Sequence, residues 1–195
     1  MSSFVPNDTL LIGGAGSELD VHGSGYRREG GSKDSISSSA NRGLATHDDP
    51  SMLILTGPNY SGKSVYLKQV ALIVFMAHVG CFVPAASAVI GLTDKLLSRV
   101  STRETVSRVQ SAFMIDLQQI SLALSLATRR SLLIIDEFGK GTSCSDGAGL
   151  ACAVMEHLLN LGPERPKVIG ATHFHGKLSG SSAQPVSHVR QKFLR

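Results

Sequence analysis

One stretch of this sequence constrains the possible fold more than any other. A short apolar run, Met52 to Leu55, leads into the loop Gly57 to Ser64, which has the pattern G-x-x-x-x-G-K-S. The two framing glycines let the backbone approach an anion closely, with successive N–H groups pointing inward. Lys63 is then placed to reach the terminal phosphates of a nucleotide, and the Ser64 hydroxyl to bind Mg2+. The pattern therefore predicts a phosphate-binding loop between a strand and a helix.

The alternative for this stretch is a plain glycine turn. The bare pattern should occur by chance in roughly one chain in a hundred of this size. An apolar run precedes it here and a helical run follows it, and the start of that helix would add its positive end to the same anion site. Nucleotide binding is therefore the working hypothesis.

The rest of the chain alternates between helical and strand-like patterns. Val65 to Val79 is apolar on nearly every face, which predicts a helix covered on all sides. A second helix is predicted from Ala112, with Arg129 and Arg130 in its last turn. Further strands are expected at 88–90, 96–100, 132–135 and 167–171, and a third helix at 146–159. This order predicts an α/β domain with a mainly parallel sheet.

Two acidic residues follow the most apolar of these strands. Asp136 and Glu137 come directly after the continuous run 132–135, which is typical of a parallel strand buried on both faces. Because open α/β sheets bind ligands at the carboxyl ends of their strands, both acids are expected beside the glycine loop. Asp136 would hold Mg2+ through water, and Glu137 would orient and polarise an attacking water. The alternative is a solvated loop or a helix cap.

Three further polar residues have both a structural and a functional interpretation. Ser111 and Asp146 stand at the starts of predicted helices, where either could be an N-cap. His173 follows the strand 167–171, and it is either a packed strand-end histidine or a sensor of the γ-phosphate. The pattern of residues does not decide between these roles.

Changes in composition divide the chain into four segments. Residues 1–12 are expected to be an N-terminal segment of the domain. Residues 13–49 are rich in glycine and serine and poor in large apolar side chains, which predicts a disordered insertion. Residues 50–175 are the expected core. Residues 176–195 carry no acidic side chain and are expected to be a divergent, solvated basic tail.

Cysteine usage and hydropathy bear on the compartment. The three cysteines form no C-x-x-C pair, and Cys81 and Cys152 lie in apolar stretches, so we expect packed thiols in a reducing, intracellular compartment. Lys68 and His78 interrupt the apolar helix 65–79, so no membrane-spanning segment is expected. The net charge of +4 permits contact with nucleic acid but does not argue for it.

The residues of these motifs resemble those of the ATPase domain of the MutS family. The matching segments, in the family's order from Met52 to about His175, are T-G-P-N-Y-S-G-K-S-V-Y-L-K-Q-V, G-C-F-V-P-A, S-A-F-M-I-D-L, I-D-E-F-G-K-G-T-S and A-T-H-F-H. The forms Y-S-G-K-S-V-Y-L-K-Q and D-E-F-G-K-G-T are most similar to the fifth-homologue branch of the eukaryotic family, which acts in meiotic recombination.

The resemblance implies a P-loop NTPase related to the ABC class, with ATP and Mg2+ held between two subunits. The implied nucleotide-binding residues are Gly57, Pro58, Asn59, Tyr60, Ser61, Gly62, Lys63, Ser64 and Val65, with Phe4 and Val5 beside the adenine. Metal binding is implied for Ser64 and Asp136, and catalytic roles for Glu137 and His173.

The resemblance also implies partners. Ser111 would reach the partner subunit's nucleotide in trans, and Asp146 would lie in the dimer interface. The implied partners are a second MutS-homologue subunit and DNA, as branched recombination intermediates or mismatched duplex, in the nucleus.

The match departs from the family pattern at several points. Ala112 replaces the usual threonine after Ser111, and Val65 stands where many members have threonine. After His175 the match is expected to end, which predicts an ATPase domain that is incomplete at its C-terminus and lacks the DNA-encircling regions. The alternatives are a truncated, non-catalytic interaction fragment and another ABC-class ATPase. The second is disfavoured because no L-S-G-G-Q-like signature precedes the acidic strand.

The composition of residues 13–49 generates the first prediction. Deleting this segment should leave the melting temperature almost unchanged, because the segment has too little apolar surface to pack. Thermal unfolding of the deleted and parent chains tests this. A large loss of stability in the deleted chain would show that the segment is an integral part of the domain.

Overall fold

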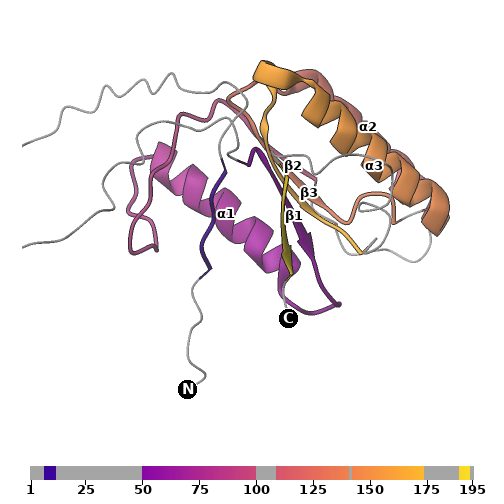
Figure 1. The fold of residues 1–195 in the computed structure, drawn as a ribbon, viewed down its shortest axis with the longest axis horizontal. Helices are drawn as coiled ribbons and strands as arrows, with labels where there is room; N and C mark the ends of the chain where they lie inside the picture. The colour runs from indigo at the N-terminus through magenta and orange to yellow at the C-terminus, as the bar shows by residue number, and fades with distance from the viewer. Residues whose placement is uncertain (1–6, 12–49, 100–108, 141, 174–188, 194–195) are drawn as a thin grey trace, which may run out of the picture.

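The computed structural model describes residues 7–11, 50–99, 109–140, 142–173 and 189–193. Five parallel strands in these ranges form one sheet, in the order β2-β3-β4-β1-β5, with helices on both faces (Figure 1). The elements are β1 (Met52–Thr56), α1 (Lys63–His78), β2 (Leu96–Arg99), α2 (Val109–Leu126), β3 (Leu132–Asp136), α3 (Cys144–Asn160), η1 (Gly162–Glu164), β4 (Lys167–Ala171) and β5 (Val189–Phe193). The predicted α/β domain with a parallel sheet is confirmed.

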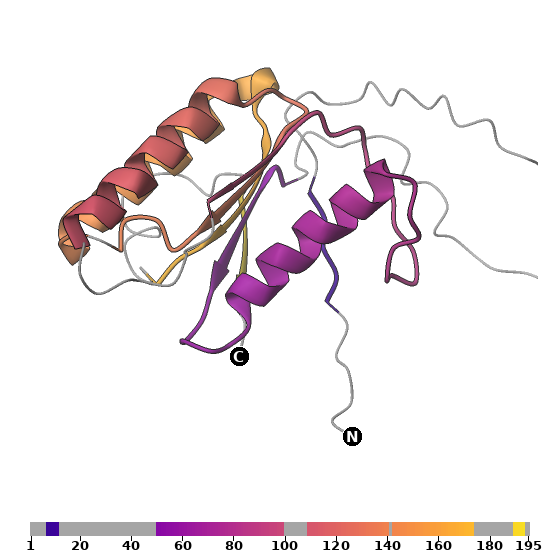
Figure 2. The ribbon, with the colours of Figure 1, turned by 180° about the vertical axis from the view of Figure 1, so that it is seen from behind.

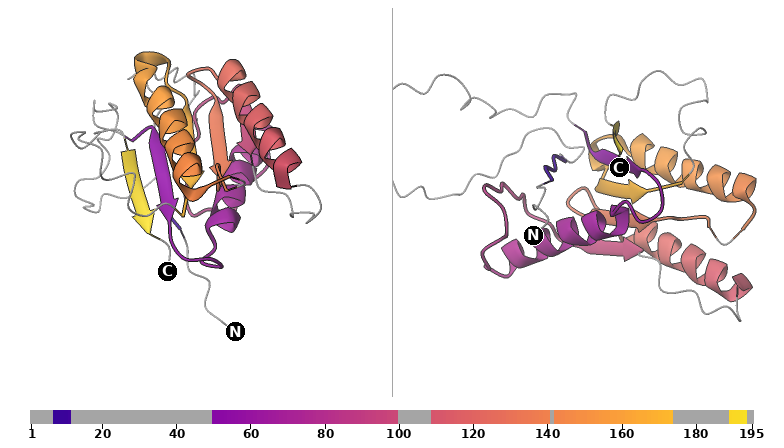
Figure 3. Two further views of the ribbon diagram at one scale, coloured as in Figure 1. Left: turned by 90° about the vertical axis from the view of Figure 1, so that its right-hand side faces the viewer. Right: turned by 90° about the horizontal axis from the view of Figure 1, so that it is seen from below.

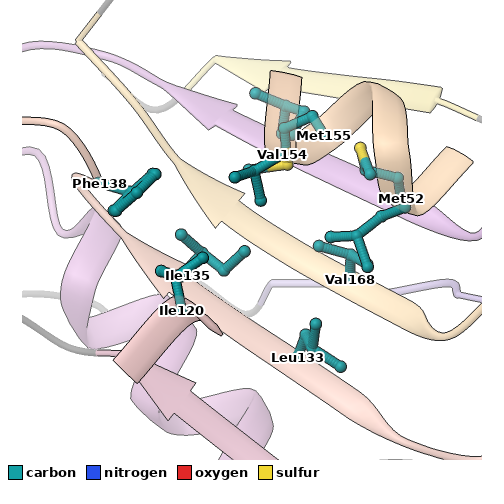
Figure 4. Close-up of a cluster of buried hydrophobic side chains, with 10 residues drawn as sticks. Met52, Ile120, Leu133, Ile135, Phe138, Val154, Met155 and Val168 are labelled. Carbon is teal, nitrogen blue, oxygen red and sulfur yellow. The ribbon is translucent and has the colours of Figure 1, made fainter. Parts of the chain in front are cut away.

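The sheet lies between two helical layers. α1 lies on one face, and α2 and α3 run side by side on the other (Figures 2 and 3). Because successive strand residues point to opposite faces, Met52 and Ile54 pack beneath α2 and α3, whereas Leu53 and Leu55 pack beneath α1. The cluster beneath α2 and α3 consists of Met52, Ile54, Ile120, Leu133, Ile135, Phe138, Val154, Met155, Leu158 and Val168 (Figure 4).

The strand register brings three carboxyl ends to one edge of the sheet. Leu55 near the end of β1 is paired with Ala171, the last residue of β4. Asp136, the last residue of β3, is paired with the same Ala171. The loops that leave β1, β3 and β4 therefore begin within one or two strand spacings of each other.

The expectation that α1 is covered on all sides is wrong for the described residues. Leu72 and Phe75 are 59% and 55% exposed, and in the described part of the chain α1 is the only helix on its face of the sheet (Figure 3). Cys81, expected to be packed, is exposed just beyond the helix, and Cys152 is half-buried in α3. The predicted strand at 88–90 is an irregular segment.

The ends of α2 and α3 differ from the sequence expectation. α2 begins at Val109, so Ser111 lies within its first turn and is not its N-cap. α3 is capped by Ser143, whose hydroxyl accepts a hydrogen bond from the backbone N–H of Asp146 at 3.2 Å. Asp146 is therefore not the cap but a first-turn acid, a position where negative charge is favoured. α2 ends at Leu126, so the two arginines at 129 and 130 follow it in a turn.

Residues 189–193, expected to belong to a solvated tail, instead form edge strand β5. This strand pairs with β1 from Met52↔Val189 to Thr56↔Phe193. The Lys192 ammonium lies 4.7 Å from the centroid of the Tyr66 ring and donates to the Asp8 carbonyl oxygen at 3.3 Å. These contacts join β5 and residues 7–11 to the first turn of α1. The predicted insertion, and Phe4 and Val5, lie outside the described residues.

None of the helices that the structure describes is both long and apolar enough to cross a lipid bilayer.

Close packing of two glycines generates the second prediction. A Cβ added at Gly147 in α3 would lie 2.1 Å from the Gly139 carbonyl oxygen, whereas one added at Gly149 meets nothing within 4 Å. Gly147→Ala should therefore lower the free energy of unfolding by about 2 kcal/mol or more. Gly149→Ala, the matched control in the same helix, should raise it by about 0.5–1 kcal/mol. Urea unfolding measures both, and equal stability of the two variants would contradict the packing.

Candidate functional site

The loop after β1 has an unusual backbone. Gly62 has φ 91° and Tyr60 has φ 63°, so both lie in the left-handed region. Glycine adopts this region freely, but for a tyrosine it costs of the order of 1–3 kcal/mol. The Tyr60 side chain is fully exposed at 106%, so burial of its ring does not offset that cost. The loop conformation is therefore imposed by its neighbours, as is common at ligand-binding loops.

Lys63 closes this loop from the inside. It is the first residue of α1, and its exposed fraction is only 4%. Its ammonium donates hydrogen bonds to the carbonyl oxygens of Gly57 at 2.9 Å and Pro58 at 2.8 Å. A phosphate in the loop would compete with these two carbonyls for the ammonium. The N-terminus of α1, a helix of 16 residues, begins at the same place and favours an anion there.

Asp136 is a buried acid at the carboxyl end of β3. It is 2% exposed, and its Oδ1 atom has no hydrogen-bond partner among the described residues. An unpartnered carboxylate oxygen is costly to bury, and a water held by a cation would satisfy it. Ser64, a half-buried hydroxyl on α1, is the second oxygen ligand expected from the sequence.

This donor set fits Mg2+. The described residues hold no group of three or more His, Cys, Asp or Glu that could bind a metal. Mg2+ does not need such a group, because it is commonly held by one or two carboxylate or hydroxyl oxygens together with substrate phosphates and water. Asp136 and Ser64 would supply the protein's share.

Glu137 is held on several sides. Its backbone has φ 52°, strained for a non-glycine residue, and its N–H donates to the Ala171 carbonyl oxygen at 3.0 Å. Its Oε2 accepts from the Lys140 ammonium at 3.2 Å, and its Oε1 is hydrogen-bonded to Nε2 of His173. Partial burial raises the pKa of Glu137, but the hydrogen bonds and charges of Lys140 and His173 outweigh it and hold the pKa below its ordinary value. Glu137 is therefore a fixed, ionised carboxylate.

The structure brings together the loop residues, Asp136, Glu137 and His173, each at or just beyond the carboxyl end of a strand. Asp146 is exposed in the first turn of α3, which packs on the loop after β3 through the close contact of its glycine 147 with glycine 139. Only the backbone of Ser111 is described, near the start of α2.

Sequence reasoning missed Lys140 and Arg99. Lys140 stands three residues after Glu137 in the same motif, so its charge beside two acids was a usable signal. Arg99 is a 5% exposed arginine at the end of β2, paired with Asp116 of α2. Nothing in the local sequence predicts that pairing, because the two residues come from different elements.

The altered pKa of Glu137 generates the third prediction. A carboxylate whose folded-state pKa is lowered contributes stability that is fully present above the ordinary value of 4.5 and is lost as the pH falls through the lower folded-state value. Glu137→Gln keeps the shape but removes the charge, so it should be less stable than the parent at pH 7, and this difference should shrink below pH 4.5. Urea unfolding at both pH values measures it.

The control is Glu156→Gln on the exposed side of α3, which should stay within about 0.5 kcal/mol of the parent at both pH values. A stability difference for Glu137→Gln that is independent of pH would contradict the ionised, hydrogen-bonded carboxylate.

Comparison with known proteins places this arrangement in a family. Residues 53–192, which include all or most of every strand from β1 to β5, match the family described as MutS domain V. The match extends past His175, so the expectation that it ends there is wrong.

Curated relatives agree with this match. MutS protein homolog 5 of Saccharomyces cerevisiae is 42% identical over 177 residues, which cover 90% of this chain and 17% of that protein. The DNA mismatch repair proteins MutS of Caldicellulosiruptor saccharolyticus and Dehalococcoides mccartyi are 46% and 48% identical, over 66% of this chain and 15% of each protein. The chain therefore spans between 15% and 17% of the length of these relatives. From the sheet order, the loop after β1 and these matches we conclude that the chain belongs to the MutS family, within its domain V.

Proposed function

We propose that this chain is the ATP-binding and ATP-hydrolysing module of a MutS-homologue DNA clamp, built as a P-loop NTPase of the ABC-related type. One observation carries the proposal. A closed phosphate-type loop, a buried carboxylate with an unpartnered oxygen, and a glutamate fixed by a histidine all lie at one edge of the sheet. Membership of MutS domain V supports it.

The chain's own residues divide the work of binding. The loop Gly57 to Ser64 binds the phosphates through the backbone N–H groups that it has at every position except Pro58, with Lys63 donating to the terminal phosphates in exchange for its loop carbonyls. Ser64 and Asp136 would hold Mg2+, which when bound neutralises charge that develops on the phosphates. Asn59 is in the same loop, and the resemblance to the family implies that it would lie beside the γ-phosphate.

Glu137 is the proposed catalytic base. Its ionised carboxylate orients water and accepts the proton as the water attacks. His173, bonded to Oε1 through Nε2, holds the carboxylate in one rotamer and would respond to the γ-phosphate. The Lys140 ammonium on Oε2 would have to release that oxygen, or bind the water as well, for Glu137 to act.

A second subunit completes the site in this proposal. Ser111, at the start of α2, would contact the partner's nucleotide in trans, and Asp146 would lie in the shared interface. The nucleotide would then be enclosed between two subunits and shielded from bulk water. The chain on its own should therefore hydrolyse ATP slowly.

We infer a role in meiotic recombination, in the nucleus, on branched DNA intermediates. The similarity to MutS protein homolog 5 covers 90% of this chain, whereas that to the bacterial mismatch repair proteins covers 66%. Recognition of mismatched duplex is the second candidate, because those bacterial relatives are named DNA mismatch repair proteins. In both cases the partner would be a second MutS-homologue subunit.

A non-catalytic interaction fragment is the alternative to an ATPase. The observation that favours it is the engagement of Lys63 by the carbonyls of its own loop, which would oppose phosphate binding.

The fourth prediction separates these functions by nucleotide binding. Lys63→Ala should weaken Mg-ATP binding at least about tenfold, because a charge-assisted hydrogen bond to phosphate is lost. Glu137→Gln should bind ATP with the parent's affinity but slow its hydrolysis in the assembled dimer about 100-fold or more. Calorimetric titration and single-turnover hydrolysis measure these effects.

The matched control is Lys68→Ala on the exposed side of α1, which should change neither quantity. Unchanged ATP affinity in Lys63→Ala would overturn the assignment of the loop. A parent chain that binds no ATP, alone or with a partner subunit, would favour the interaction fragment.

A further inference from the structure

We propose that Arg99 is a positioning residue that fixes the peptide between Asp136 and Glu137, and that Asp116 of α2 holds Arg99 in place for this task. The effect of this contact on hydrolysis rests on the proposed ATPase function. The contact itself can be tested without nucleotide.

Arg99 makes contacts in two directions from the carboxyl end of β2. Its Nε donates to Oδ1 of Asp116 at 3.1 Å, and its Nη2 pairs with Oδ2 of the same carboxylate. Its Nη1 donates to the backbone carbonyl oxygen of Asp136. Arg99 is 5% exposed and the Asp116 side chain 18%, so solvent screens this group little. A bidentate arginine–carboxylate pair fixes the guanidinium plane and thereby aims its third nitrogen.

The peptide that receives this contact is held from both sides. Its carbonyl oxygen, on Asp136, accepts from Arg99 on the β2 side. Its N–H, on Glu137, donates to Ala171 on the β4 side at 3.0 Å. Glu137 leaves this peptide with φ 52°, a conformation that a glutamate does not adopt unless it is constrained. The two hydrogen bonds therefore set the direction in which both acidic side chains leave the strand.

An ordinary structural ion pair is the alternative. A buried pair is weak evidence for a stabilising role, because desolvation of both charges opposes their attraction. A pair that only joined β2 to α2 would have no need of the Asp136 carbonyl. The contact with that carbonyl, at the peptide between the two acids, is what points to positioning.

The arrangement also links α2 to the acidic pair. Asp116 lies five positions after Ser111 in the same helix, so a shift of the start of α2 would move Asp116 and, with it, Arg99. Contact of Ser111 with a second subunit's nucleotide would thereby change the positions of Asp136 and Glu137 in this subunit. The hydrogen bonds of Arg99 thus reach both α2 and the acidic peptide.

The chain provides a matched control at the other end of the same elements. Lys95, directly before β2, donates to the carbonyl oxygen of Leu126 at the end of α2 at 2.9 Å. Lys95→Met therefore removes a charged tether between the same strand and helix without touching the acidic peptide. Arg99→Met removes the tether that reaches it.

The test is residue-resolved amide hydrogen exchange on the full nucleotide-free chain, with the global unfolding free energy of each variant measured in parallel. Exchange at the Glu137 amide should become at least tenfold faster in Arg99→Met, beyond any change at the buried β4 amides of Val168 and Ile169. Lys95→Met should leave Glu137 within twofold of the parent. Equal protection of Glu137 in Arg99→Met and the parent would overturn the proposal.

Two further variants keep the test decisive. If Arg99→Met does not fold, Arg99→Lys keeps the charge but cannot reach Asp116 and the Asp136 carbonyl together, and it should raise Glu137 exchange at least threefold. Asp116→Asn should produce an increase in the same direction. Unchanged Glu137 exchange in both would equally overturn the proposal.

Hydrolysis in the assembled dimer tests the catalytic consequence. Arg99→Lys should lower kcat at least tenfold and change KM by a clearly smaller factor, because the loop supplies most of the contacts to the phosphates. Faster Glu137 exchange with an unchanged kcat would overturn the positioning role while leaving the contact. A parent that binds no nucleotide would refute the proposed function alone, since the exchange result stands without it.

Discussion

The parallel pairing of β1, β4 and β3 is the constraint on which the rest of the structure depends. Parallel strands need a crossover after each strand, and these crossovers place α1 on one face and α2 and α3 on the other. Helices then exclude water from both faces of the sheet, which is why these three strands are apolar almost throughout. The same pairing puts the ends of the three strands at one edge. Burial of the sheet and convergence of the polar loops are thus consequences of one topology.

Much of the fold follows from local sequence, and the reasons are visible in particular residues. The run 132–135 is continuous and apolar, so a strand buried on both faces was predictable, and the acids that follow it had to emerge at the carboxyl edge. The strand 167–171 was predicted with its observed bounds. The loop Gly57 to Ser64 was recognisable because its glycines and lysine have fixed spacing. Signals of this kind depend on neighbours in the chain.

The features that were not predicted depend on contacts between elements that are distant in sequence. The apolar residues of α1 suggested cover on all sides, but hydrophobicity does not say how many layers a face receives, and Phe75 remains exposed. Strand β5 was not predicted because it contains charged residues. An edge strand pairs with one neighbouring strand rather than two, so its sequence need not be a continuous apolar run. Arg99 gave no signal because its partners come from α2 and β3. Ser143 caps α3 in place of Asp146, because a single side-chain hydrogen bond decides at which residue the helix begins.

Two strained residues and a buried oxygen without a partner lie at the carboxyl edge of the sheet, and their coincidence there argues that the edge is functional. Tyr60 and Glu137 both adopt positive φ angles, and Asp136 buries an oxygen without a partner in the described part of the chain. Each of these costs of the order of 1–3 kcal/mol in a protein whose total stability is about 5–15 kcal/mol. The core beneath α2 and α3 can offset such costs, but it does not require them. Selection for stability alone would remove them, since a glycine at either strained position would relieve the backbone. Their occurrence together is expected of a site arranged in advance for a charged ligand.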